Sequence, residues 1–245
     1  MEFVHTTHYT VTKLHGDCFG RCKPSSLLRF AQDAAGEHCL KLGTDWDSMA
    51  AKNYFWAVIR QKMEISRLPE VGETVTVKTW PMPTTRVAYP RATEGFDEAG
   101  NSLFKVISLW VIMDMQTRAM VLPGKSGIDV AGVSFGTELK APAGLPAGSF
   151  ENQLLRSVTG EDLDRNSHMN NARYLDWLCD LKDPDYHKDH PMKAVTICYM
   201  SEALEGQQLQ LSYTQGDVLR LDGSLAGTDV CAGHTRIFSY RFCKV

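Results

Sequence analysis

The stretch PSSLLRFAQDAAGEHCLKLG, residues 24–43, predicts a long amphipathic helix near the start of the chain. Apolar and small residues recur in it at spacings of three and four, the pattern of a helix face buried against a core. This face comprises Leu27, Ala31, Ala34, Ala35, His38 and Leu42. Pro24 suits the first turn of a helix, and Gly43 suits the position directly after the last turn.

The segments around this helix are typical of β-strands. One strand-like segment precedes it, and several follow, among them GETVTVKTWP, whose strict alternation suits a half-buried strand. The predicted strands cover residues 4–14, 54–65, 72–81, 86–96 and 103–113. The link DEAGN before the last of them is rich in turn-forming residues. One helix followed by a set of antiparallel strands indicates an α+β fold.

The same plan is repeated in the second half of the chain. Residues 128–149 are rich in Gly, Pro and Ala and are predicted to form a linker. Beyond it, a shorter helix is expected over residues 170–181, before Pro184. Strands are expected over residues 150–159, 194–202, 208–214, 218–226 and 230–242. We therefore expect an N-terminal domain over residues 1–127, the linker, and a C-terminal domain over residues 150–245.

An alignment of the two halves makes this repeat concrete. Setting Asp17 against Asp164 pairs Phe19 with Asn166, Arg21 with His168, Leu27 with Tyr174 and Phe30 with Trp177. The positions that would pack stay apolar, whereas the Asn–His pair occurs only in the second copy. This is the pattern expected of a gene fusion in which one of two sites has degenerated.

Composition narrows the classes of function. The chain has 245 residues, 43% of them hydrophobic, and a net charge of −3, which argues against a nucleic-acid partner. No apolar run approaches the ~20 residues of a membrane span, and residues 1–11 resemble no signal or transit peptide. The seven cysteines are scattered without a C-x-x-C pair, so we expect reduced thiols in a cytoplasmic protein. Cys18 and Cys22 have no matching ligand cluster, and no metal site is predicted.

The densest polar cluster of the sequence is DRNSHMNNARYLDW, residues 164–177. Asp164, Asn166 and His168 alternate, so in extended backbone their side chains would share one side. An imidazole transfers protons near neutral pH, and an amide can hold a water or a carbonyl oxygen. The N–H groups of Asn170 and Asn171, at a predicted helix start, are candidate oxyanion donors. A simple helix cap is the alternative explanation of this cluster.

This cluster resembles the D-x-N-x-H-x-N-N-x-x-Y-x-x-W signature of plant and bacterial acyl-acyl carrier protein (acyl-ACP) thioesterases, with every fixed position present. The segments WAVIRQKMEISRLPEVGETVTVKTWP (56–81) and ICYMSEALEGQQLQLSY (197–213) are similar to strand pairs of the same family, and Glu202 stands at its catalytic acid's position. The resemblance implies a tandem (double) hot-dog fold: two antiparallel sheets, each wrapped around a helix. It also implies a degenerate first domain that holds the acyl chain.

The activity implied by the resemblance is hydrolysis of fatty acyl-ACP to free fatty acid and holo-ACP in fatty acid biosynthesis, by Asp164, Asn166, His168 and Glu202. The acyl carrier protein would be the partner. No cofactor of the enzyme is implied, because the phosphopantetheine arm belongs to the substrate. A homodimer is compatible with the sequence. Three alternatives stay open: an acyl-CoA thioesterase, a hot-dog hydratase or dehydratase, and a non-catalytic acyl-binding protein.

The sequence favours attack by water over a covalent intermediate. Some plant relatives carry a Cys directly after the acid, but here that residue is Ala203. Cys198 could share a strand face with Glu202, although we interpret it as a packing residue. Glu202 is the preferred general base, and we expect burial beside an acyl pocket to raise its pKa. His168 would share in proton transfer, and the sequence leaves the choice of base between these two residues open.

Several basic residues flank the apolar strands of the first half: Arg60, Lys62, Arg86 and Arg91. They could receive an acidic carrier protein. Solvated strand faces explain them equally well, because a net-negative chain gives no global attraction to an acidic partner.

Overall fold

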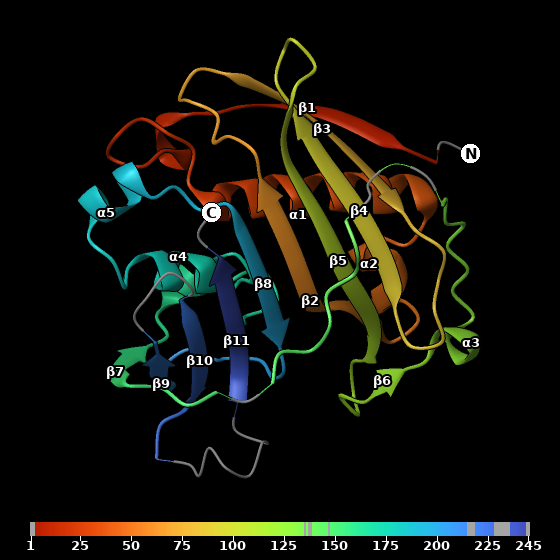
Figure 1. The fold of residues 1–245 in the computed structure, drawn as a ribbon. Helices are drawn as coiled ribbons and strands as arrows, with labels where there is room; N and C mark the ends of the chain where they lie inside the picture. The colour runs from red at the N-terminus through yellow and green to blue at the C-terminus, as the bar shows by residue number, and fades with distance from the viewer. Residues whose placement is uncertain are drawn as a thin grey trace. The chain divides into compact units, whose positions relative to one another are not determined.

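A computed structural model describes residues 3–134, 136, 139–146, 148–214 and 219–227, and the backbone of 236–243. The chain divides into two compact units, Met1–Pro142 and Ala143–Val245 (Figure 1). The predicted linker, 128–149, contains this division, and its described residues form no helix or strand. The predicted domain boundaries themselves stay predictions. None of the described helices has the length and apolar character that crossing a membrane requires.

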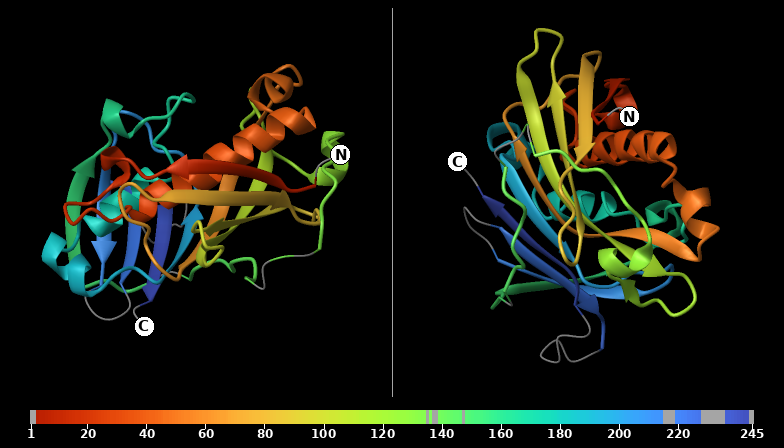
Figure 2. Two further views of the ribbon diagram at one scale, coloured as in Figure 1. Left: turned by 90° about the horizontal axis from the view of Figure 1, so that it is seen from above. Right: turned by 90° about the vertical axis from the view of Figure 1, so that its right-hand side faces the viewer.

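The first unit is an antiparallel sheet with a long helix across one face (Figures 1 and 2). Its strands are β1 (His5–Thr10), β2 (Tyr54–Ile65), β3 (Thr74–Pro81), β4 (Tyr89–Phe96), β5 (Ser102–Asp114) and β6 (Met120–Val121). Its helices are the 3-10 turn η1 (Lys13–His15), α1 (Pro24–Leu42), α2 (Trp46–Ala50) and α3 (Pro123–Ser126). Within this unit the order is β1-β3-β4-β5-β2, and β6 pairs with β5.

Helix α1 confirms the first prediction from the sequence. Pro24 occupies its first turn, and Gly43 ends it in the left-handed region at φ 66°. The predicted face is buried, apart from Leu42, which lies in the last turn and stays half-buried. The alternation predicted for β3 is confirmed over its first part, where Val75 and Val77 are fully buried between more exposed threonines, but Thr79, Trp80 and Pro81 at its end are all buried.

The second unit repeats this plan with shorter elements. Its strands are β7 (Asn152–Ser157), β8 (Ala194–Tyr199), β9 (Gln208–Tyr213), β10 (Arg220–Leu225) and β11 (Arg236–Cys243). Its helices are η2 (Gly160–Asp162), α4 (Arg173–Cys179) and α5 (Pro184–Asp189). The order β7-β9-β10-β11-β8 corresponds strand by strand to that of the first unit. The predicted α+β class with two antiparallel sheets is therefore confirmed.

Two element boundaries in the second unit differ from those predicted. The helix predicted over 170–181 covers only Arg173–Cys179, and a separate helix begins at Pro184, because proline cannot continue a helix that precedes it. The strand predicted over 194–202 ends at Tyr199. Glu202 therefore lies in the bend after β8. The predicted starts of the last two strands, 218 and 230, lie outside the described residues.

Matching backbone hydrogen bonds confirm the predicted alignment of the two halves. Asp17 N–H donates to the Arg21 carbonyl at 2.7 Å, and Asp164 N–H donates to the His168 carbonyl at 2.9 Å. The next residue along is held in the same way in each copy: Cys22 N–H donates to Pro69 O at 2.7 Å. Met169 N–H donates to Ala203 O at 2.9 Å. The two loops thus share one backbone design.

Truncation of Leu27, which is 0% exposed in α1, should lower the free energy of unfolding by about 2–5 kcal/mol. The reason is that Leu27→Ala removes buried apolar surface and leaves a cavity beneath the helix. Leu40→Ala, at a 68% exposed position of the same helix, is the control and should cost far less. Urea unfolding followed by circular dichroism measures both, and equal losses would contradict the burial assigned to this helix face.

Candidate active site in the second unit

The Asp–Asn–His cluster forms a tight backbone reversal. Leu163 and Met169 face each other across an isolated antiparallel bridge. Within it, Ser167 N–H donates to Asp164 O at 3.0 Å, and Asn166 N–H donates to the Asp164 carboxylate (Oδ1) at 2.8 Å. Ser167 closes the turn at φ 61°, in the left-handed region. Asp164 therefore organises the loop that carries the other two side chains.

The expectation of extended backbone through Asp164–His168 was wrong. An aspartate side chain that bonds the N–H two residues later stabilises a turn, and here it outweighs the alternation that suggested a strand. Asn166 is exposed at the tip of this turn, and His168 stands at its exit.

The loop and the bend after β8 bring His168 and Glu202 together. The Nε2 of His168 lies 3.3 Å from Oε2 of Glu202, with the two side chains 22% and 40% exposed. The hydrogen bond from Met169 to the Ala203 carbonyl joins the residues that follow each of them. The structure thus unites an imidazole and a carboxylate that are distant in the sequence, as the resemblance implied. Glu202 is not buried, so the burial expected for it beside an acyl pocket is not observed.

Asn170 and Asn171, which follow the turn, differ in whether their backbone N–H groups are engaged in hydrogen bonds. Asn170 N–H already donates to Asp162 O at 2.8 Å, so in this conformation it is not available to an oxyanion. The Oδ1 of Asn170 in turn accepts from Ala172 N–H at 2.9 Å, directly before α4. The carbonyl of Asn171 accepts from the Tyr199 hydroxyl at 3.1 Å. No described residue has a recorded hydrogen bond to Asn171 N–H, which makes it the remaining candidate donor.

Two tyrosines that the sequence analysis did not name as site residues support the site, Tyr174, which is buried, and Tyr199, which is half-buried. Burial raises the pKa of Tyr174 well above its ordinary value, while the Ala203 backbone hydrogen-bonds its hydroxyl, directly beside Glu202. Burial likewise raises the pKa of Tyr199. Both therefore act as neutral hydrogen-bonding groups. The signal for Tyr174 was its place in the signature, but nothing in the sequence linked Tyr199 to this loop.

The equivalent loop of the first unit has no such pair. Arg21 replaces the histidine, and its Nε and Nη2 each donate to Asp17 Oδ2 at 3.2 Å. Matching Pro69 to Ala203 through their hydrogen bonds places Leu68 where the second copy has Glu202. The first loop is therefore closed by its own ion pair and lacks both groups that could transfer a proton.

The structure supports the interpretation of Cys198 as a packing residue and corrects the placement of Arg91. Cys198 is buried in β8, and its thiol faces the Ala143 carbonyl with the sulfur 3.9 Å away. Because Glu202 lies beyond the strand end, the two do not share a strand face. Arg91 is 7% exposed, so the interpretation of it as a surface residue was wrong. Its guanidinium contacts His38 (Nη1–Nδ1, 3.1 Å) inside the first unit.

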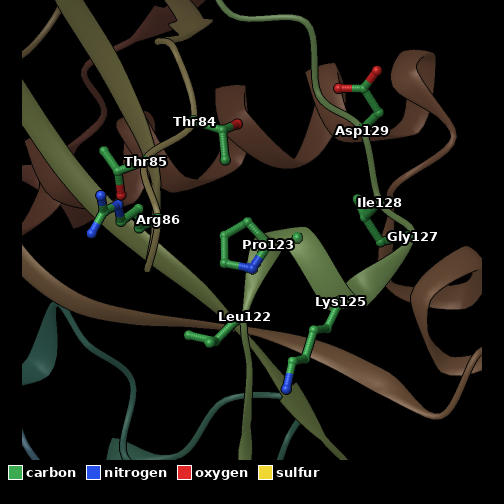
Figure 3. A pocket seen from close by; sticks show the side chains of 10 residues that line it. Thr84, Thr85, Arg86, Leu122, Pro123, Lys125, Gly127, Ile128 and Asp129 are labelled. Atoms are coloured by element: carbon green, nitrogen blue, oxygen red, sulfur yellow. The ribbon is translucent and has the colours of Figure 1, made fainter.

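A cavity of about 870 Å³ lies in the first unit, between the β3–β4 connection and α3 (Figure 3). Leu122, Pro123 and Ile128 give it an apolar part, and Arg86 and Lys125 stand at its sides. None of the six predicted site residues lines this cavity. Among the described residues, no three His, Cys, Asp or Glu side chains are grouped as metal ligands would be.

Two antiparallel sheets, each with its helix, and a Glu–His pair beside an asparagine define a double hot-dog protein of the thioesterase class. Residues 2–122 match the acyl-ACP thioesterase N-terminal domain, and residues 149–236 match the acyl-ACP thioesterase C-terminal domain. The chain belongs to the acyl-ACP thioesterase family.

Solved structures confirm the double hot-dog fold. An acyl-ACP thioesterase from Bacteroides thetaiotaomicron superposes with a TM-score of 0.88 at 20% identity, covering 99% of this chain and 98% of that one. The 12:0-ACP thioesterase from Umbellularia californica gives a TM-score of 0.80 at 20% identity, covering 100% and 98%.

Relatives in sequence are longer proteins. A chloroplastic palmitoyl-acyl carrier protein thioesterase from Gossypium hirsutum is 26% identical, covering 86% of this chain and 58% of its own length. A chloroplastic dodecanoyl-[acyl-carrier-protein] hydrolase from Cinnamomum camphora is 27% identical, covering 76% and 52%. The chain thus spans about half the length of the curated relatives that it matches.

Removal of the Tyr174 hydroxyl should destabilise the second unit. In Tyr174→Phe the Ala203 backbone loses a buried partner, which should cost about 1 kcal/mol in urea unfolding. Tyr54→Phe is the matched control, because Tyr54 is only half-buried and its hydroxyl has no recorded hydrogen bond to a described residue. If the two variants unfold at the same urea concentration, Tyr174 does not support the bend that carries Glu202.

Proposed function

We propose that this chain hydrolyses fatty acyl-ACP thioesters to free fatty acid and holo-ACP, with water as the nucleophile. The observation that carries the proposal is the 3.3 Å approach of His168 Nε2 to Glu202 Oε2, beside a loop that presents Asn166. Family membership supports the thioester as substrate. The matched relatives from Gossypium hirsutum and Cinnamomum camphora are an acyl-ACP thioesterase and an acyl-ACP hydrolase, which supports the acyl carrier protein as its carrier.

Glu202 is the proposed general base. With 40% of its side chain exposed, its carboxylate can be reached by a water that also approaches a bound thioester. Glu202 takes a proton from this water as the water oxygen attacks the carbonyl carbon. The contact with His168 passes a proton to the imidazole, which delivers it to the sulfur as the C–S bond breaks. The proton removed from water thus leaves with the carrier thiol, and the acyl group leaves as a fatty acid.

The other predicted residues have positioning and electrostatic roles in this proposal. Asn166, at the tip of the turn, orients the water or the carbonyl through its amide. Asp164 holds the turn through its bond to Asn166 N–H. Asn171 N–H is the proposed oxyanion donor, because Asn170 N–H is engaged with Asp162.

The first domain, 1–127, is proposed to hold the acyl chain. Its loop lacks the histidine and the glutamate, so its retention fits a binding role better than a second reaction centre. A cytoplasmic location and a homodimer stay predictions, as does the physiological role in fatty acid biosynthesis.

Loss of either member of the pair should abolish most of the activity. Glu202→Gln and His168→Ala should each lower kcat on acyl-ACP on the order of 10²–10⁴-fold, because each removes one proton-transfer group. Thiol release from a panel of acyl-ACP and acyl-CoA thioesters measures this. If the wild-type protein cleaves only acyl-CoA, the assignment of the carrier is wrong. If it cleaves neither kind of thioester but binds acyl chains, the proposal that it is an enzyme is wrong.

Cys198→Ala should keep wild-type activity in the same assay. Cys198 is buried in β8 against Ala143, and the proposed mechanism forms no bond to a thiol. Iodoacetamide treatment of native wild-type protein should likewise leave the rate unchanged if that rate depends on water attack alone. A loss of activity in correctly folded Cys198→Ala comparable to that of Glu202→Gln would replace water by a covalent thiol mechanism.

A further inference from the structure

An ion pair joins the two ends of the loop that carries the candidate site. Asp162 is the last residue of η2, and Arg173 is the first residue of α4. Arg173 donates to Asp162 Oδ1 through Nε at 2.9 Å and Nη2 at 2.8 Å. Its Nη1 donates to Asp176 Oδ2 at 3.0 Å. Asp164, Asn166, His168 and Asn171 all lie between the two paired residues.

The carboxylate of Asp162 is held on both oxygens. Oδ2 accepts from Thr159 N–H and Thr159 Oγ1, each at 3.0 Å. The residue is only 3% exposed. Burial alone would raise its pKa, but the bonds from Thr159 and Arg173 outweigh this, and the pKa of Asp162 is lowered. A backbone bond from Asn170 N–H to Asp162 O closes the same gap. The two ends of the loop, at Asp162 and at Asn170 to Arg173, are therefore held together by these bonds.

The first unit, whose loop lacks the histidine and the glutamate, holds its equivalent loop in a different way. At the positions equivalent to Asp162 and Arg173, the first unit has His15 and Ser26, and Ser26 Oγ merely donates to His15 O at 3.1 Å. That copy is braced inside the loop by the Asp17–Arg21 pair. In the second copy the internal arginine has given way to His168. Position 168 therefore cannot form the arginine–aspartate ion pair of the first loop, and the Arg173–Asp162 ion pair joins the two ends of this loop.

We propose that Asp162 and Arg173 are positioning residues for this reaction: their ion pair holds Asn166 and His168 in register with Glu202 without touching the substrate. This inference rests on the proposed function. The second copy has a histidine where the first has the arginine of its internal ion pair, and the Asp162–Arg173 pair adds to the support that Asp164 gives the turn. A loop that is misplaced by about 1 Å can lose on the order of 10² in rate.

The test compares Arg173→Gln, Arg173→Lys and Asp162→Asn with the control Asp180→Asn. Asp180 forms an exposed ion pair in the same unit, with Arg156 at 2.8 Å, and lies outside the loop. We expect Arg173→Gln and Asp162→Asn to lower kcat on acyl-ACP about 10- to 100-fold with KM little changed, because the reacting groups are displaced. Arg173→Lys should recover most of the rate, and Asp180→Asn should match wild type.

A double-mutant cycle separates this role from general destabilisation. If Asp162 and Arg173 act through one another, Asp162→Asn/Arg173→Gln should be no slower than the slower single variant. All rates are measured well below each variant's melting temperature. Variants that melt earlier but keep the wild-type kcat would overturn the proposal, and so would an equal loss of kcat in Asp180→Asn.

NMR spectra of the His168 ring test the inference without turnover. In Asp162→Asn, the chemical shifts of the His168 ring should move toward those seen in Glu202→Gln, because the loop no longer holds the two groups together at 3.3 Å. Unchanged chemical shifts would overturn the positioning role, even if no thioester is hydrolysed. Inactivity of the wild type with changed chemical shifts in Asp162→Asn would reject only the proposed function. If Arg173→Gln does not fold, Asp162→Asn carries both measurements.

Discussion

One backbone hydrogen bond, from Met169 N–H to the Ala203 carbonyl, determines where the candidate site can form. It joins a turn that follows η2 to a bend that follows β8, and each of its two residues directly follows a proposed proton-transfer group. Met169 and Ala203 are both buried, and buried backbone groups must find partners, so this link is required by the fold before any chemistry is considered. Once this link brings positions 168 and 202 close together, a histidine and a glutamate at these positions are enough to form the pair.

The first unit shows that the link is architectural. Its counterpart, Cys22 N–H to the Pro69 carbonyl, is kept although Arg21 and Leu68 stand where the second copy has its histidine and glutamate. Side chains at the loop could therefore change without loss of the fold. The arginine gave the first loop an internal ion pair, and a positively charged guanidinium cannot act as a proton-transfer group near neutral pH. Rigidity within the loop and proton transfer by the loop exclude each other at this position.

The fold was predicted well from the sequence where the hydrophobic periodicity agreed with the residues that start and stop helices. Helix α1 has both a continuous apolar face and a glycine stop, and its limits were found almost to the residue. The alignment of the halves succeeded because Leu27 and Tyr174, like Phe30 and Trp177, fill the same buried positions. In the second unit, Pro184 interrupts the corresponding helix, so its periodic signal is short and its start was misplaced by three residues or so.

The candidate site was predicted as a set of residues but not as a geometry. Alternation of Asp164, Asn166 and His168 suggested a strand, because a left-handed residue such as Ser167 leaves no trace in a hydrophobic pattern. The end of β8 at Tyr199 was equally hidden, and with it the exposure of Glu202. The Asp162–Arg173 pair could not be found from the sequence, because it depends on the fold of the loop, which brings its first and last residues together.

Two carboxylates beside this loop, those of Asp162 and Glu202, differ in what surrounds their oxygens. Asp162 has both oxygens filled by N–H and O–H donors, which lower its pKa and suit it to hold a structure. Glu202 faces His168 and keeps 40% of its side chain open to solvent, which suits it to exchange a proton with water. A general base needs access to its substrate proton as much as it needs a suitable pKa. Asp162 thus holds the two ends of the loop together. Glu202, across the Met169–Ala203 link, is the carboxylate that water can reach.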